Sequence, residues 1–218
     1  MNELIALFEF IGTVAFALSG ALIAIGANLD IFGVVFVGCI TAVGGGITRD
    51  LLLGIHPPTI FLNYHICLVA MAVSIVIFII AYIYKRQFAA IRSKLEYINT
   101  FFDAVGLAAF TLTGSEVAFT HGFSDNAFIV IFVGMITGVG GGIIRDIIIH
   151  TTPYVFKKHV YALASILGSL VYFLLKINLD NSPIVSVVPM VLVVVVRMLA
   201  ARYRWSLPRV DTSRNKER

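Results

Sequence analysis

Charged residues are scarce in this chain of 218 residues: only 13% are Asp, Glu, Lys or Arg, while 59% are hydrophobic. An ordinary soluble domain carries about 25% charged residues, and the mean hydropathy here is +0.97. A water-soluble globule is therefore excluded. The chain also has only two cysteines, Cys39 and Cys67, both inside apolar runs. They form neither a disulfide framework nor a CxxC metal site.

The common motifs of soluble enzymes are missing as well. The five histidines have no metal-ligand spacing such as HExxH, and the sequence GGGITRD does not continue into the GK[ST] of a phosphate-binding loop. Ser19 and Thr113 precede glycines, but no histidine is predicted at their depth to activate them as nucleophiles. We expect no enzyme activity, no metal site and no cofactor.

Long apolar segments are abundant. A helix needs about 20 mostly apolar residues to cross a bilayer, and polar or proline-containing breaks separate seven segments of this kind. They are residues 4–26, 31–53, 59–84, 98–122, 127–149, 157–177 and 184–203. The sequence before the first segment, Met1-Asn2-Glu3, has no basic residue and no cleavage site follows, so a retained span is expected there instead of a signal peptide. The sequence predicts an all-α membrane protein with seven transmembrane helices.

Positive charge collects at one side of the predicted spans. The net charge of +4 alone would fit a nucleic-acid binder, but thirteen of the 16 lysines and arginines border apolar segments, as is typical of a membrane surface. These are Lys85, Arg86, Arg92, Lys94, Lys157, Lys158 and the seven from Arg197 to Arg218. An outer N-terminus puts all thirteen inside and only Lys176 outside, so the positive-inside rule predicts N-out, C-in. We expect anionic lipid at this inner face and no nucleic-acid partner.

The second half of the chain repeats the first. Residues 31–57 and 127–153 are identical at 15 of 27 positions, including GGGxxRD and a later proline. Each copy contains three spans, an odd number, so the second copy must enter the membrane from the opposite side. We predict inverted three-helix repeats at 1–84 and 98–177. A basic cytoplasmic linker is expected at 85–97, the seventh helix at 178–205 and a basic disordered tail at 206–218.

Three consecutive glycines lie in the middle of both the second and the fifth predicted span. Each glycine costs a helix about 1 kcal/mol relative to alanine, so a break or kink is expected, and carbonyls freed there could face a cation in a wet cavity. The alternative is packing, because small residues four apart let helices approach closely. The residues concerned are Gly44, Gly45, Gly46, Gly140, Gly141 and Gly142.

Charges within the spans form a second candidate site, because such charges are costly, usually paired and often mark ion paths. Inversion places Glu9, Arg49 and Asp50 toward the outer face, and their counterparts Asp103, Arg145 and Asp146 toward the inner face. We expect Arg49 to pair with Glu9 and Arg145 with Asp103, one pair at each mouth. The aspartates of both motifs are expected to favour the start of the half-helix after the break. The pairs either mark the mouths or only hold the bundle together.

Three more polar residues are candidates for a pore wall. Thr41 and Thr137 occupy matching positions in the two copies, one turn before the glycines. Glu116 has no counterpart, because the residue aligned with it is Leu22. It either lines a pore or approaches the outer surface.

Two GGGxxRD copies on the second and fifth of seven spans, in inverted repeats with a basic C-terminal tail, resemble the prokaryotic members of the trimeric intracellular cation (TRIC) channel family. The same sequences are also grouped as glycine transporter domain (UPF0126-type) membrane proteins. The resemblance covers about residues 4–203. It implies a homotrimer with one pore per protomer around kinked second and fifth helices, passing potassium and sodium ions. It also implies a location in the inner membrane of a bacterial or archaeal cell. The Lys-Glu-Val motif of the animal members is absent at 46–48 and 142–144, so their lipid-binding and gating details are not carried over.

Other functions remain open from the sequence. Inverted repeats with broken helices also fit a secondary transporter of a small amino acid such as glycine. A transporter needs a midplane site for carboxylate and ammonium that closes on one side, whereas a channel needs an open, weakly binding path. A structural or assembly protein would be favoured if the charge pairs sealed the centre of the protomer. The resemblance favours the channel.

Overall fold

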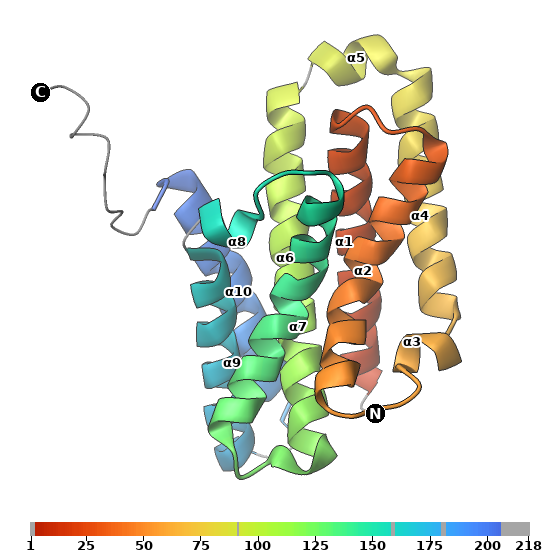
Figure 1. Cartoon of the computed structure of the whole chain (residues 1–218). Helices are drawn as coiled ribbons and strands as arrows, with labels where there is room; N and C mark the ends of the chain where they lie inside the picture. Colours follow the sequence, from red (N-terminus) through yellow and green to blue (C-terminus); the bar gives the residue numbers. More distant parts are fainter. Residues whose placement is uncertain (1–2, 91, 158–159, 180–181, 206–218) are drawn as a thin grey trace, which may run out of the picture.

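Seven long helices run between the two ends of the molecule (Figure 1). The computed structural model describes residues 3–90, 92–157, 160–179 and 182–205, and within these ranges seven helices are long and apolar enough to cross a membrane. They are α1 (Glu3–Gly26), α2 (Ile31–Leu52), α4 (His65–Ile83), α6 (Arg92–Ala118), α7 (Ala127–Ile148), α9 (Val160–Leu179) and α10 (Ile184–Arg202). A π-helical turn, Phe119–Phe123, extends α6. The predicted all-α fold of seven membrane helices is confirmed.

Short helices occupy several of the predicted breaks. They are α3 (Thr59–Leu62), α5 (Lys85–Ala90) and α8 (Tyr154–Lys157). The predicted segment 59–84 is therefore divided between α3 and α4, and the predicted linker 85–97 is largely helical, because α5 fills its first half and α6 already begins at Arg92. Lysine, glutamate, leucine and alanine favour helix even where a segment is polar. The predicted tail at 206–218 lies outside the described residues.

The two halves of the chain run through the bundle in opposite directions. We call the end that carries Glu3 and α3 the Glu3 end, and the end that carries α5, α8 and Arg202 the Arg202 end (Figure 1). In the first half, α1 and α4 start from the Glu3 end and α2 from the Arg202 end, whereas in the second half α6 and α9 start from the Arg202 end and α7 from the Glu3 end (Figure 1). Equivalent side chains cap the second helix of each half, since Asp30 accepts from Gly33 N at 2.8 Å and Asn126 from Ile129 N at 3.1 Å. The predicted inversion is confirmed.

The triple glycines lie where α2 packs against α7. A Cβ atom on Gly45 would overlap the carbonyl oxygen of Thr137, and one on Gly141 would overlap that of Thr41. A Cβ on Gly140 would lie 3.1 Å from the Cα of Gly45. Both helices are described over their whole length and are helical throughout. The expected interruption of the helix is therefore not found in α2 or α7, and close packing is the role that the structure gives Gly45, Gly140 and Gly141. A bend of the helix axes without loss of hydrogen bonds stays a prediction.

The orientation in the membrane can be tested by labelling from each side. In a Cys39→Ser, Cys67→Ser background, we expect Gln87→Cys to react only from the cytoplasm and Asp125→Cys only from outside. Both side chains are exposed, and they lie at opposite ends of the bundle. The measurement is modification of intact cells and of inside-out vesicles by a membrane-impermeant maleimide. Labelling of both positions from the same side would contradict the inverted arrangement, and the reversed result would contradict N-out, C-in.

Candidate functional site

The two Arg-Asp motifs have nearly the same geometry. Arg49 Nε donates to Asp50 Oδ1 at 2.7 Å, and Arg145 Nε donates to Asp146 Oδ1 at 2.8 Å. The second oxygen of each carboxylate accepts from the backbone N–H at the start of the next short helix. That donor is Thr59 for α3, at 2.7 Å, and Tyr154 for α8, at 2.8 Å. The aspartates thus hold the following short helices and do not start a second half-helix, which corrects the expectation for them. The reason is that α2 and α7 continue without interruption through the glycines.

The Thr59 hydroxyl strengthens this attachment, because it also donates to Asp50 Oδ2, at 2.6 Å. We expect Thr59→Val to lower the free energy of unfolding by about 1 kcal/mol, since it removes one charge-assisted hydrogen bond but keeps the backbone donor. The measurement is thermal unfolding in detergent. Thr100→Val is the matched control, because the hydroxyl of Thr100 donates to Glu96 O of its own helix, at 2.8 Å, on an exposed stretch. Equal losses in the two variants would contradict a special role for the Asp50 contact.

At the Arg202 end, Arg145 forms the predicted pair with Asp103. Arg145 Nη1 lies 3.0 Å from Asp103 Oδ1, and the arginine is fully buried. The same nitrogen donates to Ser19 Oγ at 3.1 Å, and Ser19 in turn donates to Asn99 Oδ1 at 2.8 Å. One guanidinium therefore connects α1, α6 and α7. Burying it is tolerable because two carboxylates compensate its charge.

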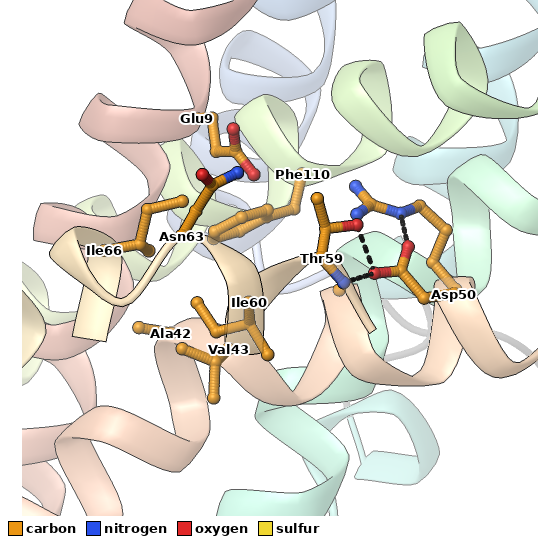
Figure 2. A pocket seen from close by; sticks show the side chains of 11 residues that line it. Glu9, Ala42, Val43, Asp50, Thr59, Ile60, Asn63, Ile66 and Phe110 are labelled. Atoms are coloured by element: carbon orange, nitrogen blue, oxygen red, sulfur yellow. Dashed lines mark hydrogen bonds and ion pairs between the residues drawn. The ribbon is translucent and has the colours of Figure 1, made fainter. Parts of the chain in front are cut away.

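The corresponding pair at the Glu3 end does not form. Among the described residues, no ion pair joins Arg49 to Glu9, and Arg49 pairs instead with its neighbour Asp50. Glu9, Arg49, Asp50, Thr59 and Asn63 line a common cavity of about 20 Å³, enough for about one water molecule. Figure 2 shows Glu9 beside Asn63, while Asp50 is joined to Thr59 on the other side of the cavity. The prediction of an Arg49–Glu9 pair is therefore wrong: the two side chains line the same cavity, but the ion pair of Arg49 is with Asp50.

Sequence reasoning missed Arg197 of α10. Arg197 Nη2 lies 3.8 Å from Asp103 Oδ2, and the guanidinium stacks over the Tyr161 ring at 4.6 Å. The side chain is only 2% exposed. Its place next to Arg202 and Arg204 groups Arg197 with the basic residues of the predicted inner surface. The run of apolar residues at 191–196 just before it is the signal that could have placed it within the membrane.

The other candidates for the pore wall have local partners. The hydroxyls of Thr41 and Thr137 donate to carbonyls of their own helices, Val37 O and Val133 O, both at 2.6 Å. Glu116 accepts a hydrogen bond from the Tyr172 hydroxyl and pairs with Lys176 at 3.5 Å. The charge of Glu116 is thus compensated between α6 and α9. That any of the three contacts an ion stays a prediction.

A second and larger cavity opens at the Arg202 end, between α1, α4 and α6. Its volume is about 690 Å³, and both apolar and polar side chains line it. The polar lining residues are Asn28, Tyr82, Lys85, Glu96, Asn99 and Tyr154. Burial raises the pKa of Tyr154 above its usual range.

A buried layer separates the two cavities. Along α1, Glu9 lines the small cavity and Leu22 the large one, and along α6 the corresponding residues are Phe110 and Asn99. Phe16 and Ser19 lie between these levels on α1 and are fully buried. The Phe16 ring stacks on Phe110 with centroids 5.3 Å apart. The structure thus has a polar recess at each end of α1 and α6, with aromatic and hydrogen-bonded contacts between them.

Known proteins share this sequence pattern and this fold. The family model described as Glycine transporter matches residues 6–82 and again 100–176. The inner membrane protein YadS of Escherichia coli K12 is 34% identical over 204 residues, 92% of this chain and 93% of that protein. YvgT, a membrane protein of Bacillus subtilis 168, is 35% identical over 202 residues, 93% of this chain and 94% of its own. Both carry the family designation UPF0126.

Solved structures show the same architecture. A prokaryotic TRIC channel crystallised in 0.5 M KCl is 32% identical and superposes with a TM-score of 0.84, over 95% of this chain and 100% of that one. A TRIC cation channel solved to explain its conductance is 35% identical with a TM-score of 0.79, over 94% of this chain and 97% of that one. The resemblance drawn from the duplicated motif is confirmed. Seven apolar helices and relatives named as inner membrane proteins also confirm the predicted location, a multi-pass protein of a bacterial inner membrane. Two copies of the family match on inverted three-helix halves identify the chain as a member of the glycine transporter (UPF0126) family, with the fold of prokaryotic TRIC channels.

Proposed function

We propose that this protein is a cation channel, that it assembles as a homotrimer with one pore in each protomer, and that it passes potassium and sodium ions. The observation that carries the proposal is the pair of recesses at opposite ends of α1 and α6 within one protomer. In a chain whose fold matches TRIC cation channels, this pair supports a path that runs between the recesses. Relatives named as membrane proteins and neighbours named as channels fit a protein that is not an enzyme.

The chemistry along this path suits a weakly held cation. Glu9 offers a carboxylate without an ion-pair partner among the described residues at the Glu3 end, and Asn63 and Asn99 offer amide oxygens. Weak and repeated binding is what conduction requires, because an ion that is held tightly cannot leave. In the structure the path is closed at the level of Phe16 and Ser19, both fully buried. Opening then requires a displacement of the Phe16–Phe110 stack and of the Ser19–Asn99 contact.

The alternative is a secondary transporter of a small amino acid, which the description of the family model favours. A glycine site needs a cation for the carboxylate and an acceptor for the ammonium group at the same depth. The charge of the buried Arg145 is compensated by Asp103 and Asp146. Arg145 lines neither the small cavity nor the large one. This arrangement favours the channel.

The two functions are separated by one pair of measurements on the purified protein. We expect unitary cation currents in planar bilayers with KCl or NaCl, and no concentrative uptake of radiolabelled glycine by proteoliposomes. Uptake without unitary currents would support the transporter. The absence of both currents and uptake would support the structural or assembly role. Mass measurement in detergent with crosslinking tests the trimer, and a stable monomer or dimer would overturn that part.

A further inference from the structure

The two ends of the proposed path differ in buried charge, because the seventh membrane helix, α10, contributes an ion-paired arginine to only one of them. The inverted repeat makes Glu9 and Asp103 equivalent positions in α1 and α6. Asp103 lies between two arginines, at 3.0 Å from Arg145 and 3.8 Å from Arg197. Arg197 belongs to α10, which lies outside the repeat, so no residue of the first half corresponds to it.

Formal charges make the difference explicit. At the Arg202 end, the buried groups Asp103, Arg145, Asp146 and Arg197 sum to zero. At the Glu3 end, Arg49 is matched by Asp50, and Lys176 by Glu116, each within an ion pair. Glu9 is left over and lines the cavity. The Glu3 end therefore carries one more negative charge within the membrane.

We propose that Arg197 is a positioning residue: it neutralises the carboxylate of Asp103 at the Arg202 end and thereby makes conduction asymmetric. This inference rests on the proposed channel function. A negative charge in a low-dielectric wall raises the local concentration of cations, and Glu9 does so only at the Glu3 end. Cations then flow more readily from the Glu3 end to the Arg202 end than in the reverse direction at equal and opposite voltages.

The position of Arg197 explains how a residue outside the recess can act on it. Asp103 shares Arg145 with Ser19, and Ser19 bonds Asn99, which lines the large cavity. The Tyr161 ring covers the Arg197 guanidinium, so the charge is shielded from water and weakly screened. Arg202, on the same helix, is exposed and its charge is screened.

Single-channel rectification in symmetrical KCl tests the proposal, with a C-terminal affinity tag and its binder used to identify the side of insertion. We expect Arg197→Gln to raise the current that starts from the Arg202 end by about twofold, as for a unit charge roughly 10 Å away in a partly screened medium. The ratio of the current from the Glu3 end to the current from the Arg202 end then falls toward one. Arg197→Lys keeps the charge and the ratio, and Arg202→Gln is the matched control with an unchanged ratio.

Charge-balanced variants separate this role from a merely structural one. Asp103→Asn leaves one excess positive charge at the Arg202 end and is expected to increase the ratio, whereas Asp103→Asn with Arg197→Gln restores neutrality and the wild-type ratio. Glu9→Gln should reduce the current from the Glu3 end. These variants keep the test open if Arg197→Gln alone fails to fold.

The outcomes distinguish the inference from the function beneath it. No cation current from the wild-type protein would refute the channel itself. Suppose instead that the wild type conducts. If Arg197→Gln has the same current ratio as the wild type, or if Asp103→Asn has the same ratio with and without Arg197→Gln, the role of Arg197 is overturned and the channel stays in place. A wild-type ratio of one would overturn the asymmetry of the mouths.

Discussion

Replacing Gly45 or Gly141 by alanine is expected to destabilise the protein by about 3 kcal/mol or more, at the upper end of the usual cost of overpacking. The added methyl group would overlap the carbonyl oxygen of Thr137 in the first variant and of Thr41 in the second. Both oxygens belong to helix backbone at the contact of α2 with α7, so neither can rotate away as a side chain does. The measurement is the yield of folded protein and its midpoint of thermal unfolding in detergent.

Gly46→Ala is the control within the same triple glycine. A Cβ there would meet only Arg49 Nη2, at 3.9 Å, an ordinary contact. Because alanine is the better helix former, we expect stability to be unchanged or to rise by up to about 1 kcal/mol. Conduction should also persist, since α2 is a continuous helix. A loss of stability as large as that of Gly45→Ala would contradict the packing explanation, and a selective loss of conduction would restore the hypothesis of a functional helix break.

Replacing Arg145 by methionine is expected to cost about 3 to 5 kcal/mol, the usual loss when one partner of a buried ion pair is removed. The fully buried guanidinium contacts Asp103 at 3.0 Å and Asp146 at 2.8 Å, and methionine fills much of its volume without its charge. Asp103 then keeps only its ion pair with Arg197, and Asp146 loses its ion pair with Arg145. Thermal unfolding in detergent measures the loss.

The second replacement Asp103→Asn should recover part of this stability, since it restores the balance of charge. A double-mutant cycle measures the coupling, which we expect to exceed about 1 kcal/mol. Arg49→Met is the matched variant in the other repeat, and its cost should be smaller, because Asp50 retains both hydrogen bonds from Thr59. Strict additivity of Arg145→Met and Asp103→Asn would show that the contact contributes nothing to stability. Equal costs for the two arginines would contradict the difference between the repeats.

The membrane helices were predictable because their signal is local. An apolar run of about 20 residues satisfies its backbone only as a helix in hydrocarbon, so each of the seven spans can be read without its neighbours. The ends were less predictable. Helix α6 begins at Arg92 instead of 98, and α5 occupies a stretch read as linker, because charged residues end the apolar pattern without ending the helix.

The candidate site was likewise predictable only in part. The pair Arg145–Asp103 followed from the depth of each residue in its span and was confirmed at 3.0 Å. The pair Arg49–Glu9 followed from the same reasoning and was wrong, because depth does not decide which of two nearby carboxylates a guanidinium contacts. Arg197 could not be assigned to Asp103 at all, because the side-by-side packing of α10 and α6 is not encoded in the spacing of either helix.

The number of spans, the duplication and the inversion followed from the amino-acid sequence, because hydrophobic length and an odd number of crossings depend only on order along the chain. The sequence left open whether the glycines break their helices or pack them, and which charges meet. Those questions were decided by the tertiary structure, in which the Thr41 and Thr137 carbonyls occupy the space where a Cβ atom on Gly141 or Gly45 would lie. The physical reason is that close packing and ion pairing depend on distances of a few ångströms between helices far apart in the chain.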